Sequence, residues 1–547
     1  MGQYDSSLRV CLLFDVPRTA SLTCGTQRSG EDPTKVRVVR GGARISDSAH
    51  WKQLAEQELK IALNRKTNTN KAQNVILFVG DGMGGTTVTG TRILRGQTQG
   101  ATGEETVLEF EKFPNVGFSK TYSQDRQTTD SAATATALLC GEKSNYRLIG
   151  LSDLARDGQC ASQHGNELQC AFEWFRADGR SVGMVSTARI THATPAAAYA
   201  KSVSRNWEVD GDMVGVTGWC KDIASQLIYN NSYVKVMLGG GRQFFLGRND
   251  SDPELNDKNF AKQRLDGVNL IKVWQEEKKR NNLKAEYVWN KGDFDAIDPS
   301  STDYLLGLFE ASHMQYDLDR DKSQIGEPSL AAMTQKAIRV LQKDKNGFFL
   351  LVEGGRIDHA HHENNAKRAL YDGLAFEDAV KIATEMTDEK DTLIIVTADH
   401  AHVFNIAGYP ARGNNIFGVV DNDEDLNGPY FTTLSYGNGP GYGTGNRTDV
   451  KATDTTDKDY LQAAAAPRFE DSHGGQDVGI YARGPMAHLI HGVHEQHYIA
   501  HVMTYAACVA DNKQRCDAIE ANGVSRSKMA EVVVLLTCVA SHLLYFY

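Results

Sequence analysis

Asn74-Val-Ile-Leu-Phe-Val-Gly80 is a run of apolar residues that leads directly into Asp81. Three other apolar runs also lead into polar residues: Gly347–Val352 into Glu353, Thr392–Ala398 into Asp399-His400, and Ser181–Ser186 towards His192-Ala-Thr194. Short runs of this kind, rich in β-branched residues, predict strands that are buried on both faces. Because ligands gather beyond the carboxyl ends of parallel strands, we expect the four endings to meet in one site.

The rest of the chain alternates between strand-like and helix-like patterns. A further strand-like run begins at Val234, and helical patterns cover Leu330–Gln342 and Lys367–Thr387. This alternation predicts an α/β fold, a three-layer sandwich around a large, mainly parallel sheet. The formal net charge of −10 over 547 residues argues against a nucleic-acid partner.

Two segments depart from the alternation. His50–Arg65 has apolar residues at helical spacing, which predicts an amphipathic helix before the first strand. Residues 408–471 are rich in Gly, Asn, Asp and Thr, with scattered aromatic residues, and this composition predicts a loop-rich insertion.

The C-terminal segment has three parts that together form a processing signal. The small residues Ala521-Asn522-Gly523 precede a polar spacer, Ser525–Glu531, and an apolar tail, Val532–Tyr547. The tail is shorter than the roughly 18 to 20 residues that span a bilayer as a helix. We therefore predict a glycosylphosphatidylinositol (GPI) attachment signal over 517–547, removed on maturation. Asn522 is the predicted attachment residue, with Ala521, Gly523 and Ser525 as competitors. The alternative is a buried terminal strand or helix.

The N-terminal segment fits a secretory signal poorly. Arg9 and Asp15 interrupt the short apolar patch around Leu12-Leu13-Phe14. We interpret residues 1–47 as an uncertain segment, either a mispredicted start or a pro-segment. The main folded domain is expected over residues 48–516.

Nine cysteines are few for a chain of this length, so the core is not expected to depend on disulfides. Cys508 and Cys516 are close enough in sequence to close a small loop. Cys140 lies in an apolar stretch and is interpreted as a packed thiol. The remaining internal cysteines offer one pair and a leftover: Cys160, Cys170 and Cys220. Glycosylation sequons, which are used only in a secreted chain, start at Asn230, Asn249 and Asn446.

A serine stands where a helix of small residues should begin, in Asp130-Ser-Ala-Ala-Thr-Ala-Thr-Ala137. The N–H groups and dipole at such an N-terminus stabilise an oxyanion and favour phosphate. Alone, the segment is an ordinary N-cap, and only the surrounding ligands change this interpretation. Asp358 and His362, one helical turn apart, and His473 in a glycine-flanked loop extend the ligand set. Histidine with carboxylate suits zinc, whereas carboxylate with hydroxyl suits magnesium.

Several motifs, in this order, carry a family resemblance: Gly80-Asp-Gly-Met-Gly84, Asp130–Ala137, Arg205-Asn-Trp207, Val352–His359, Thr397-Ala-Asp-His400 and His473-Gly-Gly475. The chain resembles the alkaline phosphatases, in particular the animal, GPI-anchored branch, from about His50 to about Cys516. The resemblance implies hydrolysis of small-molecule phosphate monoesters at alkaline pH through a phosphoserine intermediate. It also implies a homodimer held through its GPI lipid on the extracellular face of the plasma membrane.

The resemblance implies a role for each matched residue. Ser131 is the nucleophile, Arg205 clamps the phosphoryl oxygens, and His192 lies near magnesium and substrate. Two Zn²⁺ and one Mg²⁺ are expected per subunit. Their ligands would be Asp358, His362 and His473 for one zinc, Asp81, Asp399 and His400 for the other, and Asp81, Thr194 and Glu353 for magnesium. The family often has Ser where this chain has Thr194, and Thr keeps the hydroxyl.

Some implied features are left open by the residues themselves. A calcium site is implied at Glu254, the Phe309 carbonyl, Glu310 and Glu327, although Glu327 stands where the family has Asp and a solvated acidic loop is the alternative. By the same resemblance, Cys160–Cys220 and Cys508–Cys516 would be disulfides, and Cys170 stays unexplained. The helix at His50–Arg65 would embrace a partner subunit, and residues 408–471 would form the crown of the homodimer.

Three other functions compete with this interpretation. A sulfatase of related architecture needs a C/S-x-P-x-R motif, which we do not find. A phosphodiesterase of the same superfamily often uses Thr as nucleophile and lacks the third metal, whereas this chain has Ser131, Glu353 and Thr194. A non-catalytic surface protein would have a broken ligand set, yet every expected ligand is present.

Overall fold

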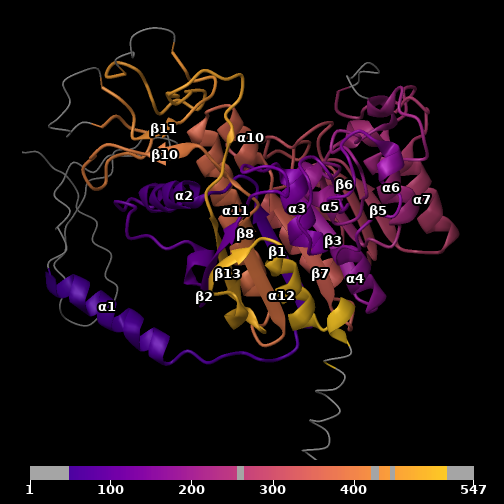
Figure 1. Ribbon diagram of the computed structural model, residues 1–547, viewed down its shortest axis with the longest axis horizontal. Coiled ribbons are helices and arrows are strands. Elements are labelled where there is room, and N and C mark those ends of the chain that lie inside the picture. The colour runs from indigo at the N-terminus through magenta and orange to yellow at the C-terminus, as the bar shows by residue number, and fades with distance from the viewer. Residues whose placement is uncertain (1–47, 256–263, 421–429, 444–449, 514–515, 517–547) are drawn as a thin grey trace, which may run out of the picture. The chain divides into compact units, whose positions relative to one another are not determined.

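The computed structural model describes residues 48–255, 264–420, 430–443, 450–513 and 516 (Figure 1). In this part of the chain one large sheet has ten strands, in the order β14-β2-β13-β8-β1-β7-β3-β4-β6-β5. All neighbouring strands are parallel except β13, which runs antiparallel to both β8 and β2. The strands are β1 Asn74–Gly80, β2 Asn115–Lys120, β3 Ser181–Arg189, β4 Val236–Gly240, β5 Ala285–Val288, β6 Tyr304–Leu308, β7 Phe348–Gly354, β8 Thr392–Ala398, β13 Val478–Arg483 and β14 Gly492–Glu495.

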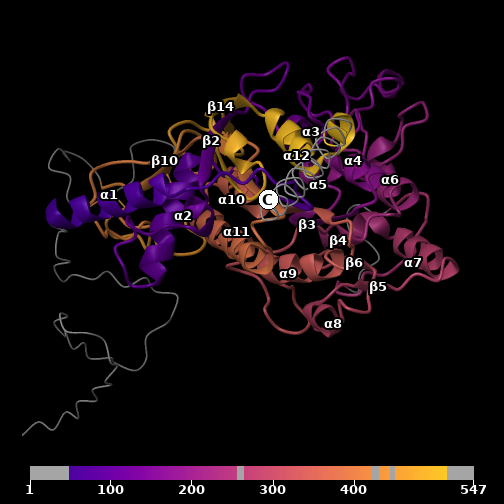
Figure 2. The ribbon, with the colours of Figure 1, turned by 90° about the horizontal axis from the view of Figure 1, so that it is seen from below.

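Helices cover both faces of this sheet, so the predicted three-layer α/β sandwich is confirmed (Figure 2). One face packs against α3 Ser131–Cys140, α4 Ala171–Ala177, α5 Ala193–Ala197, α6 Ile223–Asn230, α7 Leu270–Arg280 and α12 Tyr498–Ala507. The other packs against α2 Gly85–Thr98, α8 Lys291–Ala296, α9 Leu330–Leu341 and α11 Ala366–Met386. A short helix, α10 Arg356–His362, follows β7.

The central strand β1 shows why its sequence is apolar throughout. Val75, Leu77 and Val79 belong to the hydrophobic core on the α3 side. Ile76 and Phe78, which alternate with them, belong to the core on the α11 side. Because successive side chains of a strand point to opposite faces, a strand between two helical layers needs apolar residues at every position.

The amphipathic helix predicted at His50–Arg65 is confirmed as α1, Ser48–Leu63. None of its residues is buried, and its larger apolar side chains are all exposed: Trp51, Leu54, Leu59, Ile61 and Leu63. None of the described helices has both the length and the apolar character needed to cross a bilayer.

The segment 408–471 is loop-rich, as predicted. Within its described residues one strand, β11 Leu434–Tyr436, pairs antiparallel with β10 Phe404–Ile406 just before the segment. A second small pair joins β9 Ala401–His402 to β12 His473–Gly474 just after it. These two pairs attach the insertion next to the predicted ligands His400 and His473.

The prediction that Cys140 is a packed thiol was wrong, because Cys140 forms a disulfide with Cys170. Cys140 is the last residue of α3, and Cys170 is the N-cap of α4, so two helices on the same face are linked. Both side chains are buried, which is equally consistent with a free thiol, and the sequence could not distinguish the two. The disulfides Cys160–Cys220 and Cys508–Cys516, which the resemblance implied, are present.

Removal of the additional disulfide should destabilise the folded domain. We expect Cys140→Ala together with Cys170→Ala to lower the free energy of unfolding by about 3 kcal/mol, because the unfolded chain regains the freedom of the closed loop. The measurement is urea denaturation of parent and double variant under oxidising conditions. Equal unfolding midpoints would show that the disulfide contributes nothing to stability.

Candidate metal centre

Three neighbouring strands at the middle of the sheet deliver the first ligands. In the β1–β7 and β1–β8 pairs, Gly80 lies opposite Gly354 and Ala398. Asp81 and Asp399, the residues that follow β1 and β8, therefore emerge at the same level of the sheet, and Glu353 lies one residue before the end of β7. All three carboxylates are fully buried. Ligand atoms of Asp81 lie within 4.8 Å of those of both Asp399 and Glu353, so these three strand ends meet as predicted.

The first group of possible ligands surrounds the predicted nucleophile. Asp81, Asp399 and His400 offer ligand atoms that lie within 4.8 Å of one another. The Ser131 Oγ atom lies 3.3 Å from Oδ1 of Asp81 and 3.2 Å from Nε2 of His400. On the next turn of α3, Thr134 donates a hydrogen bond of 3.1 Å to Oδ2 of Asp399. The helix that carries the predicted nucleophile is thereby attached to a candidate metal ligand.

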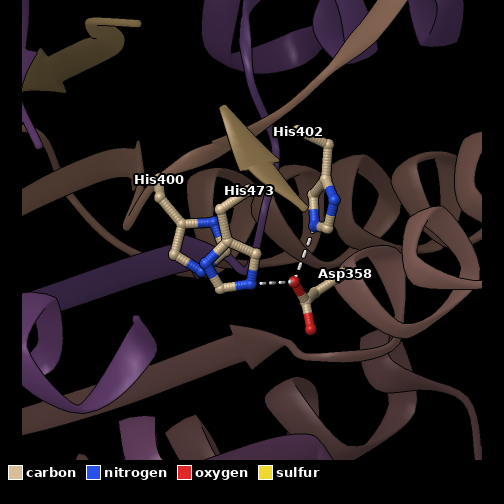
Figure 3. Close-up of side chains that lie close together, drawn as sticks. All are labelled: Asp358, His400, His402 and His473. Atoms are coloured by element: carbon tan, nitrogen blue, oxygen red, sulfur yellow. Dashed lines mark hydrogen bonds and ion pairs between the residues drawn. The ribbon is translucent and has the colours of Figure 1, made fainter. Parts of the chain in front are cut away.

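The second group centres on Asp358 (Figure 3). Oδ1 of Asp358 lies 2.6 Å from Nε2 of His402 and 3.3 Å from Nε2 of His473, and His400 lies beside them. His362 also converges here, because its Nε2 atom lies 3.4 Å from Oδ2 of Asp358 and 3.2 Å from Nε2 of His473. The structure therefore brings together the predicted trio Asp358, His362 and His473, and adds His402.

The third group shares Asp81 with the first. Asp81, His192 and Glu353 again offer ligand atoms within 4.8 Å of one another. Oδ2 of Asp81 and Oε1 of Glu353 are buried without a hydrogen-bond partner among the described residues. Thr194, in α5, is fully buried beside Glu353. Buried carboxylate oxygens without partners are costly, and a bound cation would satisfy them.

The electrostatics of the three groups also favour cations. Burial, followed by the nearby charges of Asp399, Asp358 and Glu353, raises the pKa of Asp81 well above its usual value. Burial likewise raises the pKa of Glu353 to about 7. Asp358 is the exception, because His362, His402 and His473 outweigh its burial and hold its pKa well below the usual value. This donor set of carboxylates, imidazoles and a hydroxyl fits zinc and magnesium.

Comparison with known proteins agrees with this geometry. Residues 72–509 match the family model described as alkaline phosphatase. The chain belongs to the alkaline phosphatase family. The tissue-nonspecific alkaline phosphatase of Rattus norvegicus is 48% identical over 476 residues, covering 86% of this chain and 90% of the relative. The enzyme of Homo sapiens with the same name is 46% identical over 476 residues, covering 86% of this chain and 90% of the relative.

Solved structures support the fold of this alkaline phosphatase. The enzyme from the Antarctic bacterium TAB5 aligns with a TM-score of 0.56 at 21% identity, covering 81% of this chain and 100% of the other. The Thermus thermophilus enzyme aligns with a TM-score of 0.58 at 22% identity, covering 84% and 98%. With the family shown, hydrolysis of phosphate monoesters is the activity of this chain.

Sequence analysis missed two residues that orient the site of this phosphatase. Asp130 is the N-cap of α3, and its Oδ2 atom lies 3.0 Å from Nη1 of Arg205. The same carboxylate accepts a hydrogen bond of 3.3 Å from the amide of Ala133 through Oδ1, so one side chain fixes both the helix and the arginine. The position of Asp130 directly before Ser131 is the feature of the sequence that could have identified it as a site residue.

His402 is the second residue that was missed. Its Nε2 atom lies 2.6 Å from Asp358, and its Nδ1 atom lies 2.9 Å from Oδ2 of Asp471. Burial alone would lower the pKa of His402, but the hydrogen bonds to both carboxylates raise it to about 9. Because both nitrogens are engaged, His402 is a positioning residue for Asp358. The His-x-His spacing of His400 and His402 was the sequence signal, since alternate residues of a strand share a face.

Replacement of His402 should weaken metal retention without removing a predicted ligand. We expect His402→Ala to lower zinc affinity by about 10–100-fold, the usual effect of losing a partner that orients a metal ligand. The measurement is zinc loss during titration with a chelator. His491→Ala, at an exposed position, is the matched control. Equal retention by the two variants would contradict the positioning role.

The remaining predicted site residues are those of the calcium site and the asparagines predicted for glycosylation and GPI attachment. Glu310 and Glu327 have nearby carboxylates: burial and then the charge of Glu310 raise the pKa of Glu327 to about 8, and burial and then the charge of Glu254 raise the pKa of Glu310. Phe309 follows β6 and is buried. Asn230 and Asn249 are exposed. Asn446 and Asn522 lie outside the described residues.

Proposed function

We propose that this alkaline phosphatase hydrolyses phosphate monoesters at alkaline pH by transfer of the phosphoryl group to Ser131. The observation that carries the proposal is the position of Ser131, whose hydroxyl lies 3.3 Å from Asp81 and 3.2 Å from His400, where the ligand groups meet. Ser131 is also the first residue of α3, and the positive end of a helix dipole at such an N-terminus favours a phosphoryl charge beside it.

The ligand groups support the metal assignment of the resemblance. Two zinc ions and one magnesium ion would be held by Asp358, His362 and His473, by Asp81, Asp399 and His400, and by Asp81, Thr194 and Glu353. When bound, these cations lower the pKa of a coordinated hydroxyl or water and neutralise charge on the phosphoryl group. His192 would lie beside the magnesium and the substrate.

The residues of the chain then divide the reaction into two displacements. Oγ of Ser131 forms a bond to phosphorus, the bond from phosphorus to the ester oxygen breaks, and the alcohol leaves with a proton. A water oxygen then attacks the phosphoserine and returns the electron pair to Oγ of Ser131, which releases inorganic phosphate. Arg205, oriented by Asp130, can pair two phosphoryl oxygens at once, which a lysine cannot.

The decisive experiment measures hydrolysis of p-nitrophenyl phosphate by the secreted chain at alkaline pH. Turnover should disappear after treatment with a chelator and return when zinc and magnesium are restored together. The same preparation is assayed with bis(p-nitrophenyl) phosphate, because faster hydrolysis of the diester would favour a phosphodiesterase. No hydrolysis of either ester by folded, zinc-loaded protein would favour a non-catalytic surface protein.

We also propose a calcium site at Glu254, the Phe309 carbonyl, Glu310 and Glu327. Burial and neighbouring carboxylates raise the pKa values of Glu310 and Glu327, which supports the site, since oxygen ligands of this kind suit calcium. Arg242, 2.7 Å from Glu254 through Nη2, competes for one ligand. Equilibrium dialysis should find tightly bound calcium in the parent and not in Glu327→Gln. Its absence from the parent would leave only an acidic cluster.

We further propose a homodimer anchored through GPI on the extracellular face of the plasma membrane. The exposed apolar side chains of α1 support a helix that packs on a partner subunit, and residues 408–471 would form the crown of the dimer. The small site, spacer and apolar tail over 517–547 support the anchor. Sedimentation of the secreted domain tests the dimer. Release of the full chain from cells by a phosphatidylinositol-specific phospholipase C tests the anchor.

A further inference from the structure

Two of the ligands proposed for one zinc, His362 and His473, lie outside the large sheet. His362 is the last residue of α10, and His473 begins the two-residue strand β12. By contrast, Asp81 and Asp399 directly follow two paired strands of the large sheet, which fix their level. The positions of the two histidines therefore depend on contacts made by helix ends and loops.

A backbone carbonyl sets the orientation of the His362 ring. Nδ1 of His362 lies 2.6 Å from the carbonyl oxygen of Asp471. Because a carbonyl group only accepts hydrogen bonds, Nδ1 of the neutral imidazole carries the hydrogen, and Nε2 keeps the lone pair that binds a metal ion. Nε2 is also the nitrogen that lies 3.4 Å from Oδ2 of Asp358. The carbonyl of Asp471 therefore selects the tautomer that suits zinc and directs the free nitrogen towards the other proposed ligands.

Asn438, in the loop-rich insertion, holds the same peptide group from its other side. The carbonyl of Asp471 and the amide of Ser472 belong to one planar unit, the 471–472 peptide group. Oδ1 of Asn438 accepts a hydrogen bond of 2.8 Å from this amide, and Nδ2 of Asn438 donates one of 2.9 Å to the Ser472 hydroxyl. Rotation of the peptide group away from His362 would therefore also break its bond to Asn438. Because linked hydrogen bonds polarise one another, the bond to Asn438 strengthens the carbonyl as an acceptor.

Asn364 ties Asn438 to the chain directly after α10. Nδ2 of Asn364 donates a hydrogen bond of 3.2 Å to the carbonyl of Asn438, and Oδ1 accepts one of 2.8 Å from the amide of Gly441. Asn364 is fully buried, and its φ of 55° lies in the left-handed region, which asparagine adopts more readily than most residues. A Cβ atom at Gly439 would lie 2.2 Å from Oδ1 of Asn364, so glycine allows this close approach. Asn438 is thus held in place relative to the helix that carries His362.

We propose that Asn438 is a positioning residue, which orients His362 towards its zinc through the 471–472 peptide group. The inference rests on the proposed function, because it requires that His362 holds one of two zinc ions. The other zinc has proposed ligands that follow strands of the large sheet, so its retention does not depend on Asn438. The loop-rich insertion thereby controls the retention of one metal ion in particular.

The test compares the parent, loaded with two zinc ions per subunit, with Asn438→Ala during titration with a chelator. We expect one zinc to bind about 10–100-fold more weakly in the variant, the usual effect of losing a partner that orients a metal ligand. The other zinc should bind as in the parent, which also shows that the variant is folded. Hydrogen exchange of the two loaded proteins gives a second readout, because the Ser472 amide loses its acceptor and should exchange faster in the variant.

Three further variants identify the atoms that carry the effect. Asn438→Asp keeps an acceptor for the amide of Ser472 and should bind both zinc ions like the parent. Ser472→Ala removes only the hydroxyl contact and should also bind both zinc ions like the parent. Asn414→Ala is the matched control within the insertion, because it removes side-chain hydrogen bonds to Val419 and Thr433. It should change neither zinc affinity nor the exchange of the Ser472 amide.

Four results would overturn the role of Asn438: unchanged affinity for both zinc ions in Asn438→Ala, an equal loss in Asn414→Ala, no recovery in Asn438→Asp, or an equal loss in Ser472→Ala. Each of them would leave the proposed function in place, because the parent would still be a zinc-loaded phosphatase. A folded parent that binds no zinc would instead remove the metal assignment of the proposed function, and this inference with it.

Discussion

Ser131→Ala should lower kcat for p-nitrophenyl phosphate by at least about 10⁴-fold, because removal of a catalytic nucleophile leaves only binding and electrostatic contributions. The metals should stay, since Asp81, Asp399 and His400 remain buried together whether or not the hydroxyl is present. Alanine is also well tolerated at this position, because Asp130 continues to cap the helix. The measurement combines steady-state kinetics with elemental analysis of zinc and magnesium.

Ser144 provides the matched control for the nucleophile. It is fully buried like Ser131, but its hydroxyl donates a hydrogen bond of 2.7 Å to the carbonyl of Leu151. Ser144→Ala should therefore cost about 1 kcal/mol of stability and leave turnover unchanged. If Ser131→Ala also lost its zinc, the fall in turnover would reflect a metal ligand, and the assignment of Ser131 as nucleophile would fail.

Asp358→Asn should have the second largest effect, because it neutralises the carboxylate around which three histidines gather. Oδ1 of Asp358 is held by His402, and the ring nitrogens of His362 and His473 lie 3.4 Å and 3.3 Å from the carboxylate. An amide keeps the shape and removes the charge that opposes a divalent cation. We expect loss of one zinc per subunit and a fall in kcat of about 10³-fold, the scale of lost electrostatic stabilisation in active sites.

Asp372 offers a buried aspartate outside the ligand groups for comparison. Burial raises the pKa of Asp372 to about 8, so this carboxyl group carries its proton at neutral pH. Asp372→Asn replaces one neutral group by another of the same shape and should leave zinc content and turnover close to those of the parent. Zinc retention by Asp358→Asn, with turnover like that of Asp372→Asn, would exclude Asp358 as a ligand.

The part of the site that lies at strand ends could be predicted from sequence. Asp81, Glu353 and Asp399 each lie at or directly after the end of an apolar run, and parallel pairing makes such endings converge. The antiparallel strand β13 is harder to predict from the sequence, because its residues alternate between buried and half-buried, whereas β1, β7 and β8 are buried almost throughout. The family resemblance, and not periodicity, supplied the division of ligands among metals.

The part of the site that depends on loop paths could not be predicted. His402 is held by Asp471, which lies 69 positions away in sequence, across the loop-rich insertion. His313, in the loop after β6, contacts Arg189, and nothing among its neighbours in sequence indicates this contact. The Cys140–Cys170 disulfide was hidden for a similar reason, because it depends on how closely α3 and α4 pack.

The composition of α3 has a consequence for inherited variation. This helix consists almost entirely of small residues, every one of them buried, and it packs against α5 and α12. A larger side chain at Ala133 or Ala135 would displace the helix and with it the Ser131 hydroxyl, although the sequence would still contain every residue proposed to react. Missense alleles in this segment would therefore produce enzymes with partial, temperature-sensitive activity. Alleles that change Ser131 itself would be null at every temperature.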